Sequence, residues 1–485
     1  MSSTPFRLPA LPSALRATVG RREWPPSVGE TYETGDPLEV LVPSVIGITV
    51  LCWTLSVTLR HYSFVDRLWS LLPLYYAGVI AWYAVDEALD VLQTSSTLGG
   101  VSGQSTSTET PWVSHLWSLL SLRPVIMFLL ILVWSLRLTY NFWRKGGYAW
   151  PSEDYRWRYV QREFRRISSP CMRRILWEIF NLVFIALIQN LLLVGLVYPV
   201  YVAWQAQHEG LNYVRKLVTP AIQYATAEHL SEPLLATSIE NHIYSTTLKA
   251  YSQLNLVDVL GMVLWLTWLI GEAVADQQQW QFQQAKVRYG PLRYQPSRNR
   301  DTVPTPNDTD CPQVVAQDIQ RGFLTRGLFS LSRHPNFFCE MALWWTLGLF
   351  AVAAWIAGQQ VNLILDHVIA RQTGLTLKYR HQSLLDSFYT VPGVSNLESA
   401  IVSVLIQVWA DSSLLSAFGT ILLWTVVSPL GLTVIFQGST RLTEHISRSK
   451  YPLYALYQRT TARFLPWWSA TRSPFLSLYA RKKVA

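Results

Sequence analysis

Seven long apolar stretches alternate with polar segments along the chain. They cover residues 38–59, 68–85, 124–143, 176–204, 256–273, 341–358 and 414–436. Each can cross the hydrocarbon core of a bilayer, which is about 30 Å thick and needs roughly 20 apolar residues in a helix. An eighth apolar patch, residues 400–410, is too short to cross alone. The pattern therefore predicts an all-α fold, a polytopic transmembrane helix bundle of about seven spans.

Lys and Arg are concentrated in alternate loops. Residues 144–174 carry nine of them, residues 274–340 carry eight and residues 437–485 carry nine, whereas residues 86–122 carry none. Because basic residues collect in cytosolic loops, these segments are expected in the cytosol, with the N-terminus in the lumen and the C-terminus in the cytosol. The formal net charge of +9 is then explained by orientation, and no nucleic-acid partner is expected.

Composition agrees with a membrane protein, because half of the residues are hydrophobic and only 15% are charged. We expect a polar N-terminal arm over residues 1–37, a transmembrane domain over residues 38–467 with lumenal insertions at 205–254 and 359–413, and a basic cytosolic tail over residues 468–485. The four cysteines are scattered without metal-ligand spacing, so neither a zinc site nor a disulfide framework is predicted.

The chain ends in Lys482-Lys-Val-Ala485, which has the form of a dilysine retrieval signal. Such a signal is read by a receptor only on a cytosolic tail, and the predicted orientation supplies that tail. The sequence therefore predicts an integral membrane protein of the endoplasmic reticulum. It leaves the oligomeric state open.

Five separated motifs carry a family resemblance. They are Asp66-Arg-Leu-Trp69; residues 137–148 with Glu153-Asp-Tyr-Arg-Trp157; Ala275-Asp-Gln-Gln278; Ser332-Arg-His-Pro-Asn336 with Glu340; and Lys450-Tyr-Pro with residues 457–466. Together they resemble the steroid 5-alpha-reductase-like membrane family, and more closely an uncharacterised branch of it found in bacteria, fungi and plants. The resemblance covers roughly residues 60–467. It implies a helix bundle that opens to the cytosol around NADPH and reduces a carbon–carbon double bond, conjugated to a carbonyl, in a lipid.

The cofactor that the resemblance implies needs directed hydrogen bonds and positive charge at the cytosolic membrane boundary. Asp276 matches a position where the family has a polar residue bound to the cofactor, and Glu272 lies one helical turn before it. Acidic residues near a bilayer interior normally face a partner or a polar cavity. The predicted cofactor-binding residues are Glu272, Asp276, Gln278, Arg333, His334, Asn336, Glu340, Lys450, Arg459 and Arg463. Each basic residue among them could instead reflect orientation alone.

The chain departs from the family pattern at three positions. Better-known reductases have an arginine seven residues beyond the aspartate, where this chain has Gln283. Lys286 or Arg288 could compensate for it, and the preference for NADPH over NADH is open at this point. The family pattern often has Tyr and Gly where this chain has Phe337 and Cys339, so one hydroxyl is missing.

Reduction of an enone builds negative charge on the carbonyl oxygen, so the site needs a hydrogen-bond donor aimed at that oxygen. We predict Tyr140 for this role, because a phenol can donate while it stays neutral in apolar surroundings. Asp66 is the second candidate acid. Arg137 lies three residues before Tyr140 and is expected to be paired or to face the cofactor. An interfacial tyrosine and a structural salt bridge of Asp66 are the alternative interpretations.

Two other functions fit part of the pattern. An isoprenylcysteine-type methyltransferase, from a neighbouring family, would share the Arg333-His334-Pro335 element and bind S-adenosylmethionine. The motifs at residues 275–278 and 457–466 favour the reductase side instead. A lipid-binding membrane protein without catalysis is the third hypothesis, and the departures at Gln283, Phe337 and Cys339 favour it. The sterol, polyprenoid or enoyl lipid that would serve as substrate is not encoded in any motif.

Overall fold

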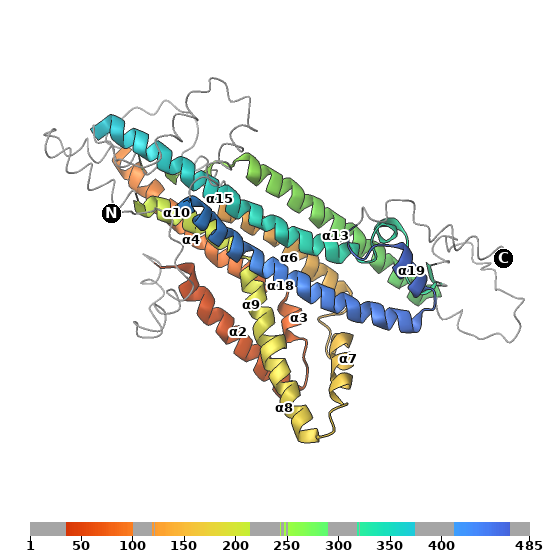
Figure 1. Cartoon of the computed structure of the whole chain (residues 1–485). Helices are drawn as coiled ribbons and strands as arrows, with labels where there is room; N and C mark the ends of the chain where they lie inside the picture. Colours follow the sequence, from red (N-terminus) through yellow and green to blue (C-terminus); the bar gives the residue numbers. More distant parts are fainter. Residues whose placement is uncertain are drawn as a thin grey trace, which may run out of the picture. The chain divides into compact units, whose positions relative to one another are not determined.

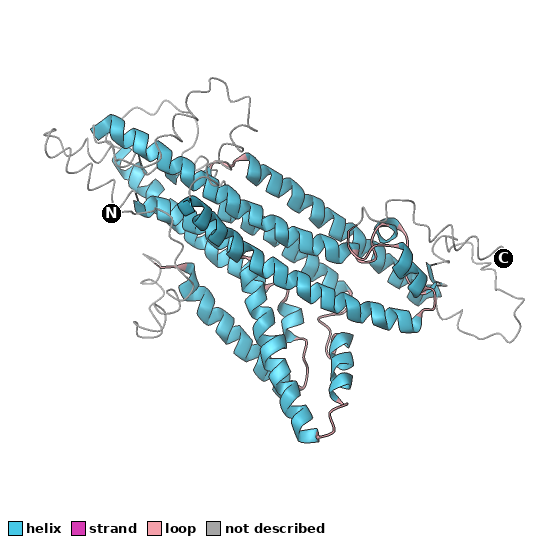
Figure 2. Cartoon of the chain, in the orientation of Figure 1, coloured by secondary structure: helices cyan, strands magenta, loops and turns pink. Residues whose placement is uncertain are grey.

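The computed structural model of the chain describes residues 35–99, 119–213, 251–289, 318–373 and 412–465, except 121 and 320, together with residues 243, 247 and 248. Every regular element in this part of the chain is a helix, as Figure 2 shows. The elements are α2 (Pro37–Leu59), α3 (Phe64–Leu68), α4 (Leu72–Gly99), α6 (Arg123–Arg144), α7 (Tyr155–Phe164), α8 (Pro170–Phe180), the π-helix η1 (Asn181–Ile188), α9 (Gln189–Leu196), α10 (Tyr198–Tyr213), α13 (Leu256–Tyr289), the 3₁₀-helix η4 (Gly327–Ser330), α15 (Pro335–Thr373), α18 (Ser412–Lys450) and α19 (Tyr454–Thr460).

Five helical segments within the described residues are long and apolar enough to cross a membrane. They are Pro37–Leu59, Arg123–Arg144, Pro170–Leu196, Leu256–Arg288 and Pro335–Gly358, and each overlaps one of the predicted spans. Most of the stretch 68–85 lies in α4, and the stretch 414–436 lies in α18. The all-helical, membrane-spanning class is thus confirmed, whereas the count of seven and the orientation stay predictions.

The predicted span at residues 176–204 needs a correction. The helix that contains it ends with α9 at Leu196, and α10 begins at Tyr198 after a non-helical Val197 with φ −91° and ψ 4°. Pro199 explains the break, since its ring nitrogen has no hydrogen to donate to a continuing helix. In the first turn of a new helix that donor is not needed, so α10 can begin there.

The chain divides into two compact units. Unit 1 comprises residues 1–261 and 347–428, and unit 2 comprises residues 262–346 and 429–485. The division falls inside α13, α15 and α18, so each of these helices contributes residues to both units.

In unit 1, α4, α6 and α10 pack against one another around large buried side chains (Figure 1). Tyr76 of α4, Trp134 of α6 and Trp204 of α10 are at most 2% exposed. α2 packs on η1 and α9, where the amide of Asn190 donates to the hydroxyl of Thr49 at 3.3 Å. In a bilayer, where lipid tails are as apolar as the core, van der Waals packing of these large side chains and hydrogen bonds between helices hold the bundle together.

A buried ion pair joins the beginning of α6 to the beginning of α13 within unit 1. Arg123 donates from Nε to both carboxylate oxygens of Asp258 at 3.0 Å, and from Nη2 to one of them at 2.9 Å. The side chains are 3% and 0% exposed. The same guanidinium also donates to the backbone carbonyls of Tyr251 and Gln253. Every part of this cation is therefore compensated by the protein, as a buried charge requires.

In unit 2, α13 and α15 run antiparallel and in close contact. The rings of Trp265 and Trp344 meet edge to face at 5.8 Å between centroids, and a Cβ added at Gly271 would lie 2.9 Å from the sulfur of Cys339. Cys339 thus lies close against Gly271, where a larger side chain on α13 would push the two helices apart.

We predict that Arg123→Ala lowers the free energy of unfolding by about 3–5 kcal/mol, because it leaves Asp258 as an uncompensated buried charge. Chemical denaturation of the detergent-purified protein measures this. Arg158→Ala is the matched control, since Arg158 is 67% exposed and its pair with Glu153 spans 3.7 Å. Arg123→Met combined with Asp258→Leu should restore most of the loss. Equal stability of Arg123→Ala and Arg158→Ala would contradict a structural role for the pair.

Candidate functional site

Two of the predicted motifs, more than 100 residues apart, contact each other in unit 2. The segment before α15 lies against the segment after α19, where the amide of Arg333 donates to the carbonyl of Ala462 at 2.9 Å and the amide of His334 donates to the carbonyl of Arg463 at 3.2 Å. The hydroxyl of Ser332 donates to the same Arg463 carbonyl at 3.0 Å. These contacts place the side chains of both motifs around one point.

Glu444 of α18 occupies that point. Its carboxylate accepts hydrogen bonds from Nε of Arg333 at 2.7 Å, from Nε2 of His334 at 3.1 Å and from the amide of Gln458 at 3.2 Å. Nε of Arg463 lies 3.6 Å away. Glu444 was not among the predicted site residues. Its signal in the sequence is that it is the only acidic residue from position 437 to the end of the chain.

The ionisation of this group follows from its surroundings. Burial acts to raise the pKa of Glu444, but the hydrogen bonds from His334 and Arg333 outweigh burial and bring the pKa to about 2. Burial lowers the pKa of His334, against the opposing effect of Glu444. Near neutral pH the cluster therefore holds an ionised Glu444, a cationic Arg333 and a neutral His334 that donates to the carboxylate.

All three nitrogens of the Arg333 guanidinium donate hydrogen bonds to the protein. Besides Glu444, the guanidinium donates from Nη1 to the carbonyls of Gln458 at 2.9 Å and of Thr461, at the end of α19. Only 8% of the residue is exposed. Arg333 thus joins α19 to α18 through four hydrogen bonds, and its burial leaves it little accessible to a phosphate group.

A second group of predicted residues lies between α13 and α15. Glu272 and Asp276 on α13 and Glu340 on α15 are each about 5% exposed or less. The amide of Asn336 donates to Asp276 at 3.4 Å, and the indole of Trp344 donates to Glu340 at 2.9 Å. The register of the two antiparallel helices places Glu272 at the level of Glu340. The structure thus brings four predicted residues together into one band between the middle of α13 and the beginning of α15. Its three carboxylates are buried and its amide, Asn336, is half-buried.

The remaining predicted residues of unit 2 lie around this band. Gln278 accepts a hydrogen bond from the amide of Leu328 at 3.0 Å, and its side chain occupies the space beside Gly327, whose φ of 58° favours glycine. Lys450 and Arg459 are exposed, and Arg463 is 35% exposed. The exposed cations are the ones with room for an anionic ligand.

The structure shows the exposure and contacts of the positions that depart from the family pattern. Gln283 is exposed on α13. Lys286 donates to the hydroxyl of Tyr451 at 2.7 Å and to the carbonyl of Gly322 at 3.1 Å, so it is already engaged with the protein. Phe337 packs between rings, stacked on His334 at 5.6 Å and edge to face with Phe436 at 4.8 Å. An aromatic cluster therefore surrounds the position of the missing hydroxyl.

The predicted catalytic residues lie in unit 1. Asp66 of α3 accepts a hydrogen bond from the indole of Trp157 at 2.9 Å. Tyr140 of α6 is 57% exposed, and its ring contacts Trp143 and the guanidinium of Arg144. Arg137 lies one turn earlier on α6 and is half-buried. Asp66 and Tyr140 therefore engage different neighbours, and the structure gives them no shared partner among these contacts.

Asp66 belongs to a contact between two further motifs. The hydroxyl of Tyr148 donates to the carbonyl of Arg67 at 3.2 Å, and Arg67 donates to the carbonyl of Ser152 at 3.1 Å. The segment from Asp66 to Trp69 is thus fastened to the loop after α6 within unit 1. This arrangement favours the alternative interpretation of Asp66, in which the carboxylate positions neighbouring segments.

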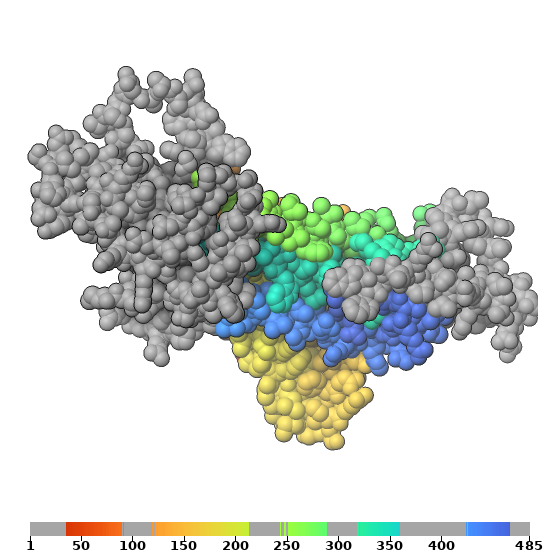
Figure 3. Space-filling view, turned by 45° about the horizontal axis from the view of Figure 1, so that its top comes forward, coloured from red at the N-terminus to blue at the C-terminus, as the bar shows by residue number. Residues whose placement is uncertain are grey.

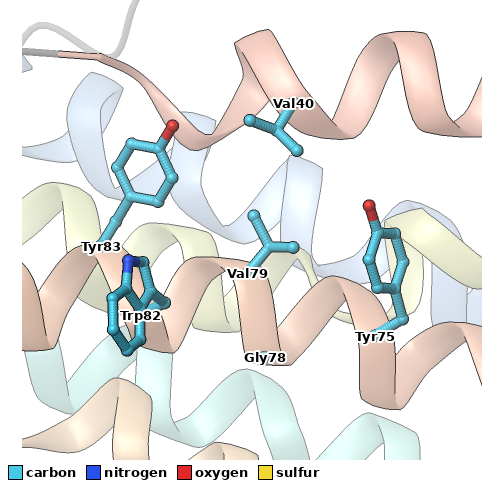
Figure 4. A pocket seen from close by; sticks show the side chains of 6 residues that line it. All are labelled: Val40, Tyr75, Gly78, Val79, Trp82 and Tyr83. Atoms are coloured by element: carbon cyan, nitrogen blue, oxygen red, sulfur yellow. The ribbon is translucent and has the colours of Figure 1, made fainter. Parts of the chain in front are cut away.

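An apolar groove in unit 1 lies between α2 and α4. Its volume is about 360 Å³, and its lining residues are Val40, Tyr75, Gly78, Val79, Trp82 and Tyr83 (Figure 4). The hydroxyl of Tyr75 is within 2.9 Å of that of Ser44. None of the predicted site residues lines this groove, and it is suited by its lining to a hydrocarbon chain. Among the described residues, no group of three or more His, Cys, Asp or Glu is arranged to hold a metal ion.

Apolar helices of membrane-spanning length, with buried polar side chains near their ends, define an integral membrane protein of the helical class. The model of the DUF1295 family, described as a protein of unknown function, matches residues 82–226 and 221–380. The chain belongs to this family, which is a member of the 5-alpha-reductase-like membrane superfamily. The predicted resemblance is confirmed at that level.

An uncharacterized protein of Schizosaccharomyces pombe is 25% identical to this chain over 430 residues, which cover 87% of this chain and 80% of that protein. No solved structure matches the chain.

We predict that acid destabilises unit 2 partly through His334. Its folded-state pKa lies below its ordinary value of 6.5, so the unfolded chain binds a proton more readily and stability falls as the pH drops below 6.5. Glu444 adds a loss only at lower pH, between its ordinary value of 4.5 and about 2. His334→Gln keeps a donor toward Glu444 but cannot titrate. Its melting temperature should therefore fall less than that of the unaltered protein between pH 7 and pH 5.

The exposed His445, one residue after Glu444, provides the control for this measurement. His445→Gln should keep the full pH dependence. If His334→Gln and the unaltered protein lose the same stability over this range, His334 is not buried in its neutral form.

Proposed function

We propose that this protein is a membrane-embedded oxidoreductase that uses NADPH to reduce a carbon–carbon double bond, conjugated to a carbonyl, in a sterol, polyprenoid or enoyl lipid. The observation that carries the proposal is the band of three buried carboxylates, Glu272, Asp276 and Glu340, with the half-buried Asn336. It lies between the middle of α13 and the beginning of α15, both of which are apolar helices. Carboxylates so close to a bilayer are costly and normally serve a ligand or a polar partner. Membership of the 5-alpha-reductase-like superfamily supports the same reading.

The residues present fit the parts of a nicotinamide dinucleotide in a specific way. Ribose hydroxyls and the carboxamide donate hydrogen bonds, which Asp276 and the neighbouring carboxylates would accept. Phosphates need accessible cations, which favours the exposed Lys450 and Arg459. Arg463 is 35% exposed beside Glu444 and could contribute from there. Arg333 and His334 would act through Glu444 by holding α18, α19 and the start of α15 in place. When bound, the cofactor supplies a hydride.

The chain itself must stabilise charge on the substrate and deliver a proton. As hydride is transferred to the β-carbon of an enone, a hydrogen-bond donor must stabilise the negative charge on the enolate oxygen. A proton is then added to the α-carbon. Tyr140 stays our proposal for the donor, with Arg137 beside it on α6. For Asp66 we propose a positioning role, because its carboxylate already accepts from Trp157.

The setting of this activity is the membrane of the endoplasmic reticulum. We propose seven spans, a lumenal N-terminus and a cytosolic C-terminus, on the basis of the loop charges. The dilysine sequence at residues 482–485, as well as most of the two lumenal insertions, lies outside the described residues. The cofactor would then enter from the cytosol and the lipid from the bilayer.

Titration of the detergent-purified protein with NADPH, NADH and S-adenosylmethionine tests the proposal. A ligand that binds only the folded state at 100 times its Kd stabilises it by about 2.7 kcal/mol, so NADPH should raise the melting temperature. Asp276→Asn and the double variant Lys450→Gln/Arg459→Gln should each weaken that effect. Arg441→Gln/Arg448→Gln is the matched control, because it removes two exposed cations of α18 and should leave NADPH binding unchanged.

The other outcomes are equally informative. Stabilisation by S-adenosylmethionine alone would replace the reductase by a methyltransferase of the isoprenylcysteine type. Stabilisation by none of the three ligands, in a protein that unfolds cooperatively, would leave a lipid-binding protein without catalysis.

A gain-of-function variant probes the most informative departure from the family pattern. Gln283→Arg places a cation on the exposed face of α13 where better-known reductases have one. We predict that it improves the affinity for NADPH relative to NADH about tenfold, which corresponds to about 1.4 kcal/mol. Gln284→Arg adds the same charge one position further along the helix, on another face, and should change the ratio much less. Equal effects of the two variants would indicate general charge attraction.

A further inference from the structure

α7 and α8 form a hairpin in unit 1, and their aromatic side chains meet in one buried cluster. The rings of Phe164 and Trp177 meet edge to face at 5.4 Å, and Trp177 and Phe180 lie 5.6 Å apart. Trp157 belongs to the same buried cluster. Figure 1 shows the two helices side by side, and Figure 3 shows their surface in orange-yellow to yellow. Their outward side chains are therefore presented from a packed support.

This hairpin carries more positive charge than the protein itself compensates. Seven arginines lie between residues 156 and 174, and three of them pair with Asp154, Glu153 and Glu163. The other four have no acidic partner among the described residues, and they cluster at the bend between the helices. They are Arg162, Arg165, Arg173 and Arg174, of which all but Arg173 are exposed.

An exposed apolar row begins at the same bend. Met172, Ile175 and Ile179 of α8 are about half exposed, at 50%, 49% and 52%, and their spacing places them on one face of the helix. α8 is the first part of the segment Pro170–Leu196, which is apolar and long enough to cross a membrane. This row therefore faces lipid tails. On α8 itself, Arg173 and Arg174 directly follow Met172. At a rise of about 1.5 Å per residue their backbone lies within about 10 Å of the row along the axis, which is the depth of the headgroups.

We propose that the bend between α7 and α8 is a binding site for anionic phospholipid headgroups. Orientation in the membrane requires only that basic residues lie on the cytosolic side. It does not require four guanidinium groups that lack an acidic partner in the described part of the chain, gathered at one bend of a packed hairpin and flanked by a lipid-facing row. Guanidinium groups bind phosphate and carboxylate oxygens through paired hydrogen bonds, and an anionic headgroup supplies both the oxygens and the net charge. The site is independent of the proposed reductase activity.

The test uses the full chain in detergent with phosphatidylserine or phosphatidylcholine added. Phosphatidylserine should raise the melting temperature more than phosphatidylcholine, and added NaCl should reduce the difference. Arg165→Gln/Arg174→Gln should weaken the apparent affinity for phosphatidylserine about fivefold per arginine, which corresponds to about 1 kcal/mol each. Arg162→Gln/Arg165→Gln/Arg173→Gln/Arg174→Gln should abolish the preference. Because these side chains make no internal ion pairs, the variants should fold, and equal melting temperatures without added lipid verify that.

Arg441→Gln/Arg448→Gln is the matched control, since it removes two exposed arginines from α18. It should keep the preference for phosphatidylserine. Equal stabilisation by the two lipids, or an equal loss in the control variant, would overturn the proposal. So would competition by millimolar inorganic phosphate, because the site would then bind soluble phosphate.

Discussion

The ionised carboxylate of Glu444 is the interaction on which the organisation of unit 2 depends. It compensates the buried cation of Arg333, accepts from His334 and Gln458, and lies near Arg463. An ion buried without a partner costs several kcal/mol, so the helix that bears Glu444 and the segments that bear the cations must stay together. The buried band between α13 and α15 begins directly after the same Arg333 segment. Any ligand held by that band would therefore depend on Glu444 without touching it.

The same rule organises unit 1, where Arg123 and Asp258 form a buried pair across 135 positions of sequence. Hydrogen bonds also join the motifs of this chain to one another. The segment at Asp66 and Arg67 contacts the loop after α6, and the segment at Arg333 contacts the one after α19. Each of these two motifs thus contacts another motif, and several of their polar side chains form hydrogen bonds with each other or with the neighbouring backbone. This shifts attention for ligand binding from Arg333 to the exposed cations and to the buried carboxylates.

Much of this architecture was predictable from the sequence. Five predicted spans correspond to apolar helices, and Asp276, Asn336, Glu272 and Glu340 were singled out before the structure grouped them. Periodic apolar residues are a local signal, so they predict helices well. The end of a helix depends on single residues. Because of Pro199, the span predicted to end at residue 204 ends at Leu196. Glu444 escaped prediction because a lone acid in a basic tail matches no motif, although its isolation was itself a signal.

The sequence by itself determined the class of this protein: long apolar helices, loops of alternating charge and the membership of a membrane superfamily. These properties follow from composition within short windows, because transfer into a bilayer is a sum over neighbouring residues. Only the tertiary structure decided what each polar residue does. All three of the following are basic residues near helix ends. Arg333 forms a buried ion pair with Glu444, Lys286 donates a hydrogen bond to the hydroxyl of Tyr451, and Lys450 is exposed. The reason is that the hydrogen bonds of a side chain depend on which distant segment packs against it. The hydropathy of the local sequence does not predict that segment.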